Sequence, residues 1–167
     1  MKKLFILFMI FSFITSFLLA NSLELGSPAP QLKVLTDQGT TFDLGEALSA
    51  GTTLVFFYPK AMTPGCVKQA CSLRDGWDEL QARNVSIFGV SSDTAKTQAQ
   101  FRDKYSLPFT LLADTDGKIA DAFSKSRWSR QAYLFKDGIL VWRDTKGATS
   151  KQATEVLAAL DELETNT

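Results

Sequence analysis

The two cysteines of this 167-residue sequence, Cys66 and Cys71, are its strongest candidates for chemistry. Cys66 is predicted to lie in the first turn of a helix that follows a buried strand, because Thr63 and Pro64 are typical of a helix start. Unpaired backbone N–H groups and the positive end of the helix dipole favour a thiolate over a thiol at such a position. Cys66 is therefore a candidate nucleophile.

The spacing of the two cysteines allows two interpretations. A stabilising disulfide is the simpler one, because paired cysteines in exported proteins usually form such links. On a regular helix, however, a separation of five residues places the two Cα atoms roughly 8.6 Å apart, whereas a disulfide requires them within about 7 Å. Either this segment is not helical, or a Cys66–Cys71 bond requires the first helical turns to unwind. A pair that must break its helix is better suited to a redox switch than to a structural link.

The composition excludes several other kinds of site. The sequence contains no histidine, which rules out Ser-His-Asp and Cys-His pairs, histidine proton shuttles and histidine metal sites. Two cysteines are too few for a four-thiolate zinc site. Asp114 and Asp116 flank a turn and are interpreted as helix caps, so no metal ligand set is predicted. The 18 basic and 18 acidic side chains cancel, so we expect no nucleic-acid partner.

Residues 1–20 are predicted to be an export signal rather than part of the core. Two lysines precede the apolar stretch 4–19, and Ala20 is a small residue that allows cleavage before Asn21. An uncleaved N-terminal anchor is the alternative, because the apolar stretch is long and Leu18 is bulky. In both cases we expect the folded part of the chain to lie in the bacterial periplasm. After cleavage we expect no stable membrane contact, whereas an anchor would hold the domain at the membrane, facing the periplasm.

The remaining chain is predicted to form one domain. Residues 21–31, which include Pro28 and Pro30, are an extended lead-in to a folded domain over 32–167. Apolar, β-branched and aromatic runs predict strands over 32–35, 40–42, 52–58, 85–91, 109–113, 131–135 and 139–142. Helices are predicted over 43–49, 64–83, 93–105, 116–123 and 150–163. Within 64–83, only Gly76 weakens the helical pattern.

This order of elements indicates an α/β domain. Strands that alternate with helices predict a central sheet with helices on both faces, and the hairpins near the two ends of the domain make that sheet mixed. In such sheets, reactive groups gather just beyond the carboxyl ends of the strands. The predicted position of Cys66, after the strand over 52–58, is such a place.

Several motifs closely resemble the peroxidatic segment of Q-type peroxiredoxins, also called bacterioferritin comigratory proteins. They are Tyr58-Pro59-Lys60, Thr63-Pro64-Gly65-Cys66, Gln69-Ala70-Cys71 and Ser72-Leu73-Arg74-Asp75. Supporting segments are Gly26-Ser27-Pro28-Ala29-Pro30, Tyr105-Ser106-Leu107-Pro108-Phe109, Leu111-Leu112-Ala113-Asp114 and Arg130 at the start of a late strand. The resemblance covers nearly the whole chain after the first twenty residues.

The resemblance implies a thioredoxin-like three-layer sandwich and a thiol peroxidase that reduces hydrogen peroxide and organic hydroperoxides without a cofactor. By analogy, Cys66 is the peroxidatic cysteine and Cys71 the resolving one, which together form an intramolecular disulfide. Thr63 donates its hydroxyl to the peroxide, and Arg130 holds the thiolate and the departing oxygen. These donors suit the chemistry, because O–O cleavage moves negative charge onto the leaving oxygen.

The same resemblance implies the surroundings and the partner of the site. The residues expected to shape the loop and the substrate pocket are Pro59, Met62, Pro64, Gly65 and Trp128. Turnover requires an external dithiol, for which a thioredoxin-like protein reductant is expected. Because a single chain carries both reactive cysteines, we expect a monomer.

The sequence also departs from the family pattern near Cys66. Ala61-Met62 stands where an acidic pair is common, Val67 replaces a threonine, and Gln69 stands where glutamate is usual. These changes make the mouth of the site less negative and more apolar. They favour bulkier hydroperoxides over hydrogen peroxide.

Other readings of the same residues remain open at this point. The chain could be a thiol-disulfide oxidoreductase that acts on protein cysteines, although such enzymes usually have two residues between their cysteines rather than four. It could also be a non-catalytic binding module with an inert disulfide. Thr63 could be a helix cap only, and only the family resemblance selects Arg130 over Arg127.

Overall fold

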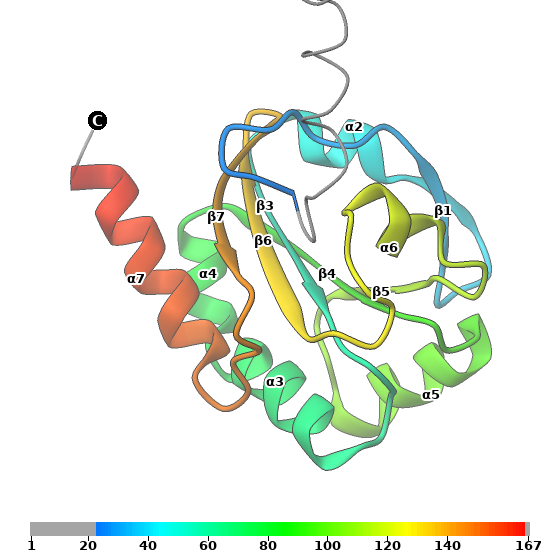
Figure 1. The fold of residues 1–167 in the computed structure, drawn as a ribbon. Helices are drawn as coiled ribbons and strands as arrows, with labels where there is room; N and C mark the ends of the chain where they lie inside the picture. Colours follow the sequence, from blue (N-terminus) through cyan, green and yellow to red (C-terminus); the bar gives the residue numbers. More distant parts are fainter. Residues whose placement is uncertain (1–22, 166–167) are drawn as a thin grey trace, which may run out of the picture.

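The computed structural model describes residues 23–165 and shows a seven-stranded sheet with helices on both sides (Figure 1). The strands are β1 (Lys33–Thr36), β2 (Thr41–Asp43), β3 (Thr52–Phe57), β4 (Val85–Ser91), β5 (Thr110–Ala113), β6 (Gln131–Lys136) and β7 (Ile139–Asp144). The helices are α2 (Leu44–Ser49), α3 (Pro64–Asp75), α4 (Trp77–Ala82), α5 (Ala95–Tyr105), α6 (Lys118–Ala122) and α7 (Gln152–Thr165). The predicted export signal lies outside the described residues. Within 23–165, no helix has the length and apolar character needed to cross a membrane.

The sheet has the mixed topology that the order of elements predicts. Its strand order is β2-β1-β5-β4-β3-β6-β7. The three central strands β3, β4 and β5 are parallel, whereas β1 pairs with β5, and β6 with β3, in the antiparallel sense. The parallel strands therefore end at one edge of the sheet, which is the edge that leads into α3.

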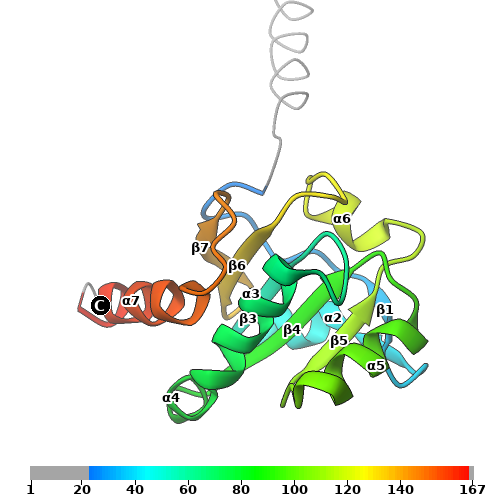
Figure 2. The same cartoon turned by 90° about the horizontal axis from the view of Figure 1, so that it is seen from below.

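Helices cover both faces of the sheet because the central strands bury alternate side chains on opposite sides. Leu54 and Phe56 of β3 share one apolar cluster with residues of α3, α4, α5 and α7, whereas Val55 and Phe57 share a second cluster with residues of α2 and α6. Figure 2 shows these two helical layers on either side of the strands. The predicted three-layer α/β fold is confirmed.

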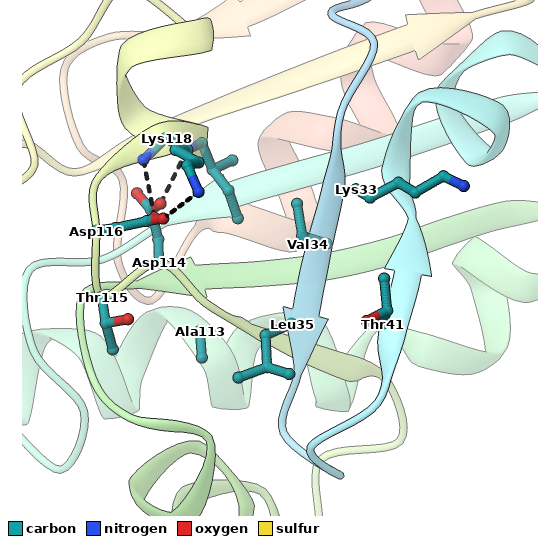
Figure 3. A pocket seen from close by; sticks show the side chains of 10 residues that line it. Lys33, Val34, Leu35, Thr41, Ala113, Asp114, Thr115, Asp116 and Lys118 are labelled. Atoms are coloured by element: carbon teal, nitrogen blue, oxygen red, sulfur yellow. Dashed lines mark hydrogen bonds and ion pairs between the residues drawn. The ribbon is translucent and has the colours of Figure 1, made fainter.

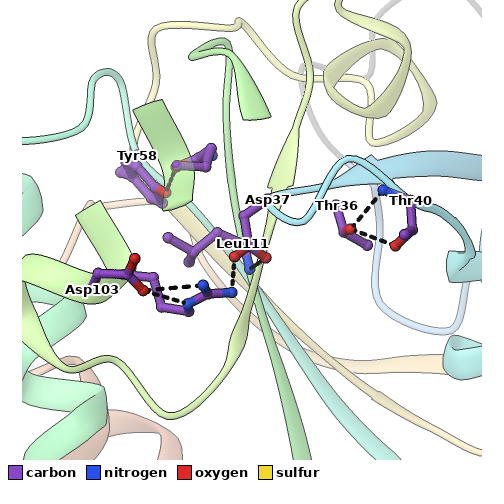
Figure 4. Close-up of polar contacts among 8 residues, drawn as sticks. Thr36, Asp37, Thr40, Tyr58, Asp103 and Leu111 are labelled. Carbon is purple, nitrogen blue, oxygen red and sulfur yellow. Dashed lines mark hydrogen bonds and ion pairs between the residues drawn. The ribbon is translucent and has the colours of Figure 1, made fainter. Parts of the chain in front are cut away.

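The N-terminal hairpin is tied to the rest of the fold through its turn (Figure 4). The buried carboxylate of Asp37 accepts a hydrogen bond from the Leu111 backbone N–H at 3.2 Å and is paired with the guanidinium of Arg102 on α5. Across the same turn, the hydroxyls of Thr36 and Thr40 lie 2.9 Å apart. The hairpin is thus fixed to β5 and α5 rather than attached by β1 alone.

The prediction of one long helix over 64–83 is wrong in one respect, because the structure divides this segment at Gly76 into α3 and α4. A Cβ atom at Gly76 would lie 2.8 Å from the Cβ of Ala153. The Ala153 backbone N–H also donates to the Ser72 hydroxyl at 3.1 Å. The division therefore occurs where α7 approaches α3, and this tertiary contact requires the absence of a side chain at Gly76.

Candidate active site

Cys66 lies in the first turn of α3, where the sequence predicts it, and is fully buried. Cys71 lies on the same helix, is partly exposed, and is a free thiol like Cys66. Since both residues are helical, the ideal geometry of a helix separates their Cα atoms by roughly 8.6 Å. The structure therefore shows the reduced arrangement, in which the two cysteines are not at disulfide distance.

The guanidinium of Arg130 is the cation beside Cys66. Its Nη2 donates to the Cys66 Sγ at 3.3 Å, and its Nη1 donates to the Oε1 of Gln69 at 2.5 Å. The strand register explains this placement, because Gln131 at the start of β6 pairs with Phe57 at the end of β3. Arg130, one residue earlier, therefore lies at the sheet edge where the loop before α3 begins.

The structure shows which of the two arginines, Arg130 or Arg127, contacts Cys66, whereas the residue pattern alone does not distinguish them. Arg127 donates from Nη2 to the backbone carbonyls of Thr115 at 2.6 Å and Asp114 at 3.3 Å, so it binds the loop before α6. Gly65 provides the room for Arg130, because a Cβ atom at Gly65 would lie 3.0 Å from the Arg130 Nη2. The expected pocket residue Gly65 is thus packed against the cation itself.

Thr63 occupies the position before the first residue of α3, as predicted, but its side chain does not cap the helix. Instead, its hydroxyl donates to the backbone carbonyl of Lys60 at 2.9 Å. The first N–H groups of a helix, including that of Cys66, have no partner within the helix. Because the Thr63 hydroxyl leaves them free, these groups remain available as donors to an anion near the Cys66 sulfur.

A buried polar network fixes the loop that precedes α3. The backbone N–H of Ala61 donates to the carboxylate of Asp93 at 2.7 Å, and the Ser91 hydroxyl donates to the same oxygen at 2.7 Å. The Tyr58 hydroxyl donates to the amide oxygen of Gln98, and burial raises the pKa of Tyr58 well above its usual value. The phenol therefore stays neutral and acts as a fixed support for the loop.

Comparison with known proteins identifies the family. A family model described as "AhpC/TSA family" matches residues 25–143. Peroxiredoxin Bcp of Escherichia coli (strain K12) is 39% identical over 121 residues, which cover 71% of this chain and 76% of that protein. Peroxiredoxin Bcp of Bacillus subtilis (strain 168) is 38% identical over 124 residues, which cover 74% and 77%. The chain belongs to this peroxiredoxin family.

Solved structures agree with this assignment. The crystal structure of peroxidoxin BcpB from Mycobacterium tuberculosis matches with a TM-score of 0.77 and 29% identity, over 84% of this chain and 97% of that one. A variant of Xanthomonas campestris peroxiredoxin Q matches with a TM-score of 0.75 and 27% identity, over 86% and 99%. The predicted Q-type branch, thioredoxin-like fold and thiol peroxidase function are confirmed, and neither alternative function is favoured.

The remaining predicted pocket residues of this peroxiredoxin lie at the surface to different degrees. Met62 is 37% exposed and has a positive φ of 65°, which is unusual for a residue with a side chain. Pro59 is partly exposed and Pro64 exposed. Trp128, which is expected in the substrate pocket, is 66% exposed. Of these residues, Met62 directly precedes Thr63 in the sequence and has an exposed, apolar side chain.

Lys125 is a buried cation that sequence reasoning missed. Its Nζ lies 4.3 Å from the centre of the Phe57 ring and donates to the Ser126 carbonyl at 2.7 Å. Burial lowers the pKa of Lys125 to about 8, and the nearby charge of Asp114 opposes this shift. A lysine followed by polar residues carries no sequence signal for burial, because the Phe57 ring reaches it only through the fold.

A pocket of about 300 Å³ lies away from the cysteines, between β1, β5 and the start of α6 (Figure 3). The carboxylate of Asp116 is paired with the Lys118 ammonium at 2.7 Å, and Asp114 accepts hydrogen bonds from the backbone N–H groups of Ile119 at 2.8 Å and Ala120 at 3.0 Å. The interpretation of Asp114 as a helix cap is confirmed. Within residues 23–165, no group of three or more cysteines or carboxylates could hold a metal ion.

Proposed function

We propose that Cys66 is the peroxidatic cysteine of this thiol peroxidase, and that Arg130 and the N-terminus of α3 stabilise its thiolate. The observation that supports this role is the 3.3 Å contact between the Arg130 Nη2 and the Cys66 Sγ. Burial alone disfavours a charged sulfur, whereas an adjacent cation and a helix N-terminus favour it. Of the two cysteines, only Cys66 combines a buried position, an adjacent cation and the N-terminal turn of a helix.

The first step is the attack of the Cys66 thiolate on the terminal oxygen of a hydroperoxide. The S–O bond forms, the O–O bond breaks, and the electron pair leaves with the departing alkoxide or hydroxide, which takes a proton from solvent. Cys66 becomes a sulfenic acid. Arg130 and the Cys66 backbone N–H are the donors placed to stabilise the charge on the leaving oxygen. The Thr63 hydroxyl joins them when it turns its single proton from the Lys60 carbonyl to the substrate.

The second step joins the two cysteines. The Cys71 thiolate attacks the Cys66 sulfenic sulfur, the S–S bond forms, and the S–O bond breaks. The departing hydroxide takes a proton from solvent and becomes water. The two residues lie on one helix, so the first turns of α3 must unwind before the Cα atoms come within disulfide range. A thioredoxin-like dithiol then reduces the disulfide. This scheme describes an atypical 2-Cys peroxiredoxin that needs no second subunit, and we propose a monomer.

The apolar mouth of the site supports a preference among substrates. Met62 is exposed next to Thr63, and Val67 on the first turns of α3 is half-buried. Neither presents a charge to the substrate, so we expect bulkier organic hydroperoxides to be reduced at least as efficiently as hydrogen peroxide. The comparison of catalytic efficiency on cumene hydroperoxide and hydrogen peroxide tests this, and a strong preference for hydrogen peroxide would contradict it.

We also propose that the chain acts outside the cytoplasm. The basic start, the long apolar stretch and Ala20 support an export signal, with an uncleaved anchor as the alternative. An exported dithiol protein must then supply the electrons, because the periplasm is oxidising. Fractionation of cells that express the full chain, with mass determination of the mature N-terminus, distinguishes cleavage before Asn21 from an anchor and from retention in the cytoplasm.

A single-turnover experiment tests the roles of the cysteines. One equivalent of hydrogen peroxide is added to the reduced chain, and free thiols are followed with time. We expect rapid loss of both thiols in the native chain, a trapped Cys66 sulfenic acid in Cys71→Ser, and no rapid reaction in Cys66→Ser. Loss of thiols at an unchanged rate in Cys66→Ser would refute the assignment.

A further inference from the structure

The guanidinium of Arg130 is held by an amide rather than by a carboxylate. Among residues 23–165, no carboxylate forms an ion pair with Arg130. Its Nη1 donates instead to the Oε1 of Gln69, and the Nε2 of Gln69 donates to the Oε1 of Gln152 at 2.8 Å. Gln69 and Gln152 are both fully buried. A chain of three hydrogen bonds therefore connects the Cys66 sulfur to the first residue of α7.

The direction of each bond in this chain is determined by the arginine. A guanidinium has only donors, so Gln69 must turn its amide oxygen toward Arg130. The NH₂ group of Gln69 then faces the opposite way and requires an acceptor. The carbonyl of the Gln152 side chain is the acceptor that the fold supplies. Without it, the Gln69 amide would bury an unpaired donor whenever it faced Arg130 correctly.

The other half of the Gln152 side chain is not used in this way. Its Nε2 is buried and has no hydrogen-bond partner within the described residues. An unpaired buried NH₂ group costs stability, so the amide is not a device for stabilising the fold. Its carbonyl, in contrast, has a short and directional contact. Gln152 thus serves the site through its oxygen.

We propose that Gln152 is a positioning residue of the peroxidase: its carbonyl orients Gln69, which holds the Arg130 guanidinium on the Cys66 sulfur. This inference rests on the proposed roles of Cys66 and Arg130. Because both amides are neutral, they do not cancel the positive charge of Arg130 beside the thiolate, as a carboxylate in their place would. Gln152 lies more than eighty residues from Cys66 in the sequence. It is connected to the reacting sulfur only through the hydrogen bonds of Gln69 and Arg130.

The test replaces Gln152 by methionine, which has a similar size and lacks a good acceptor. Every variant carries Cys71→Ser, so that Cys66 is the only thiol. Alkylation of Cys66 by iodoacetamide is followed by mass spectrometry across pH 4–9, and oxidation by hydrogen peroxide is followed in single turnover. For Gln152→Met, we expect the pH midpoint of alkylation to rise by about 0.5 to 1 unit and the oxidation rate constant to fall about threefold to tenfold, as for one lost hydrogen bond. The midpoint of thermal unfolding should stay about the same, because the variant removes the unpaired NH₂ group of Gln152 and leaves that of Gln69 without its acceptor.

Two further variants distinguish positioning from packing. Ser72→Ala removes a second hydrogen bond between α3 and α7 without touching either amide, and it should lower thermal stability while leaving the alkylation midpoint unchanged. In a Gln69→Met background, Gln152→Met should have no further effect on the midpoint, because Gln152 acts only through Gln69. Additive effects, an unchanged midpoint in Gln152→Met, or an equal shift in Ser72→Ala would overturn the inference. A Cys66 that resists peroxide already in the parent chain would instead refute the proposed function.

Discussion

The replacement of Arg130 by methionine is the most direct test of the site, because Arg127 provides a matched control three residues earlier in the same loop. Arg130 contributes one hydrogen bond to the Cys66 sulfur at 3.3 Å and one to Gln69. A hydrogen bond to a charged group is worth roughly 1.5–3 kcal/mol, and removal of one donor to a developing oxyanion typically slows a reaction by about 10²–10³. Arg130 is partly exposed, so we take the lower end of the rate range and expect about a 100-fold loss, or about 2.7 kcal/mol, which lies within the range for a hydrogen bond to a charged group.

The assay is the second-order rate constant for oxidation of Cys66 by hydrogen peroxide, measured by stopped flow in the Cys71→Ser chain. Arg127→Met removes an equal charge from the same loop, but its guanidinium binds the carbonyls of Asp114 and Thr115. We expect its rate constant to stay within about twofold of the parent value, which is less than 0.5 kcal/mol. An equal loss of activity in both variants would mean that the positive charge of the loop as a whole, rather than the contact of Arg130 with the Cys66 sulfur, supports the reaction. That result would refute the proposed role of the contact.

Three further predictions concern single side chains. Thr63→Val should slow oxidation of Cys66 about tenfold while Thr63→Ser stays near the native rate, and equal rates in stopped flow would remove Thr63 from the donor set. Lys125 has a folded-state pKa of about 8 and a higher value when unfolded, so the unfolded chain binds more protons between these values and stability rises with pH above about 8. The free energies of unfolding of the native chain and of Lys125→Met, measured in urea, should therefore converge from pH 8 to 10.5. A constant difference between the two free energies would contradict this. Met62→Glu should lower the ratio of cumene hydroperoxide to hydrogen peroxide efficiency, whereas an unchanged ratio would exclude the exposed Met62 side chain from substrate choice.

The parts of the fold that follow from local patterns were predictable from the sequence. The apolar run over 52–58 indicates a strand buried on both faces, and β3 is such a strand. Asp137 and Gly138 both adopt the positive φ, 48° and 83°, that their hairpin turn requires. Thr94 caps α5 by accepting a hydrogen bond from the Thr97 N–H. In each case, the residues that decide the structure are neighbours in the sequence.

The features that could not be predicted depend on contacts between distant segments. The break at Gly76 depends on the approach of Ala153 from α7. The choice of Arg130 over Arg127 depends on the register that pairs Gln131 with Phe57. In the sequence, only the family resemblance supports that choice. A glutamine at the start of an amphipathic helix is usually solvated, so nothing in the sequence marks Gln152 as buried.

In the mechanism that we propose, the two chemical steps need opposite states of α3. Oxidation needs α3 folded, because only then do the first-turn N–H groups and Arg130 meet at the Cys66 sulfur. Disulfide formation needs the turns between Cys66 and Cys71 unwound. Gln69 lies between the two cysteines and bonds both Arg130 and Gln152, so unwinding must also break the chain of hydrogen bonds that runs to α7. The contacts that hold Arg130 on the sulfur therefore also oppose the disulfide, and the sulfur leaves this environment only when the helix opens.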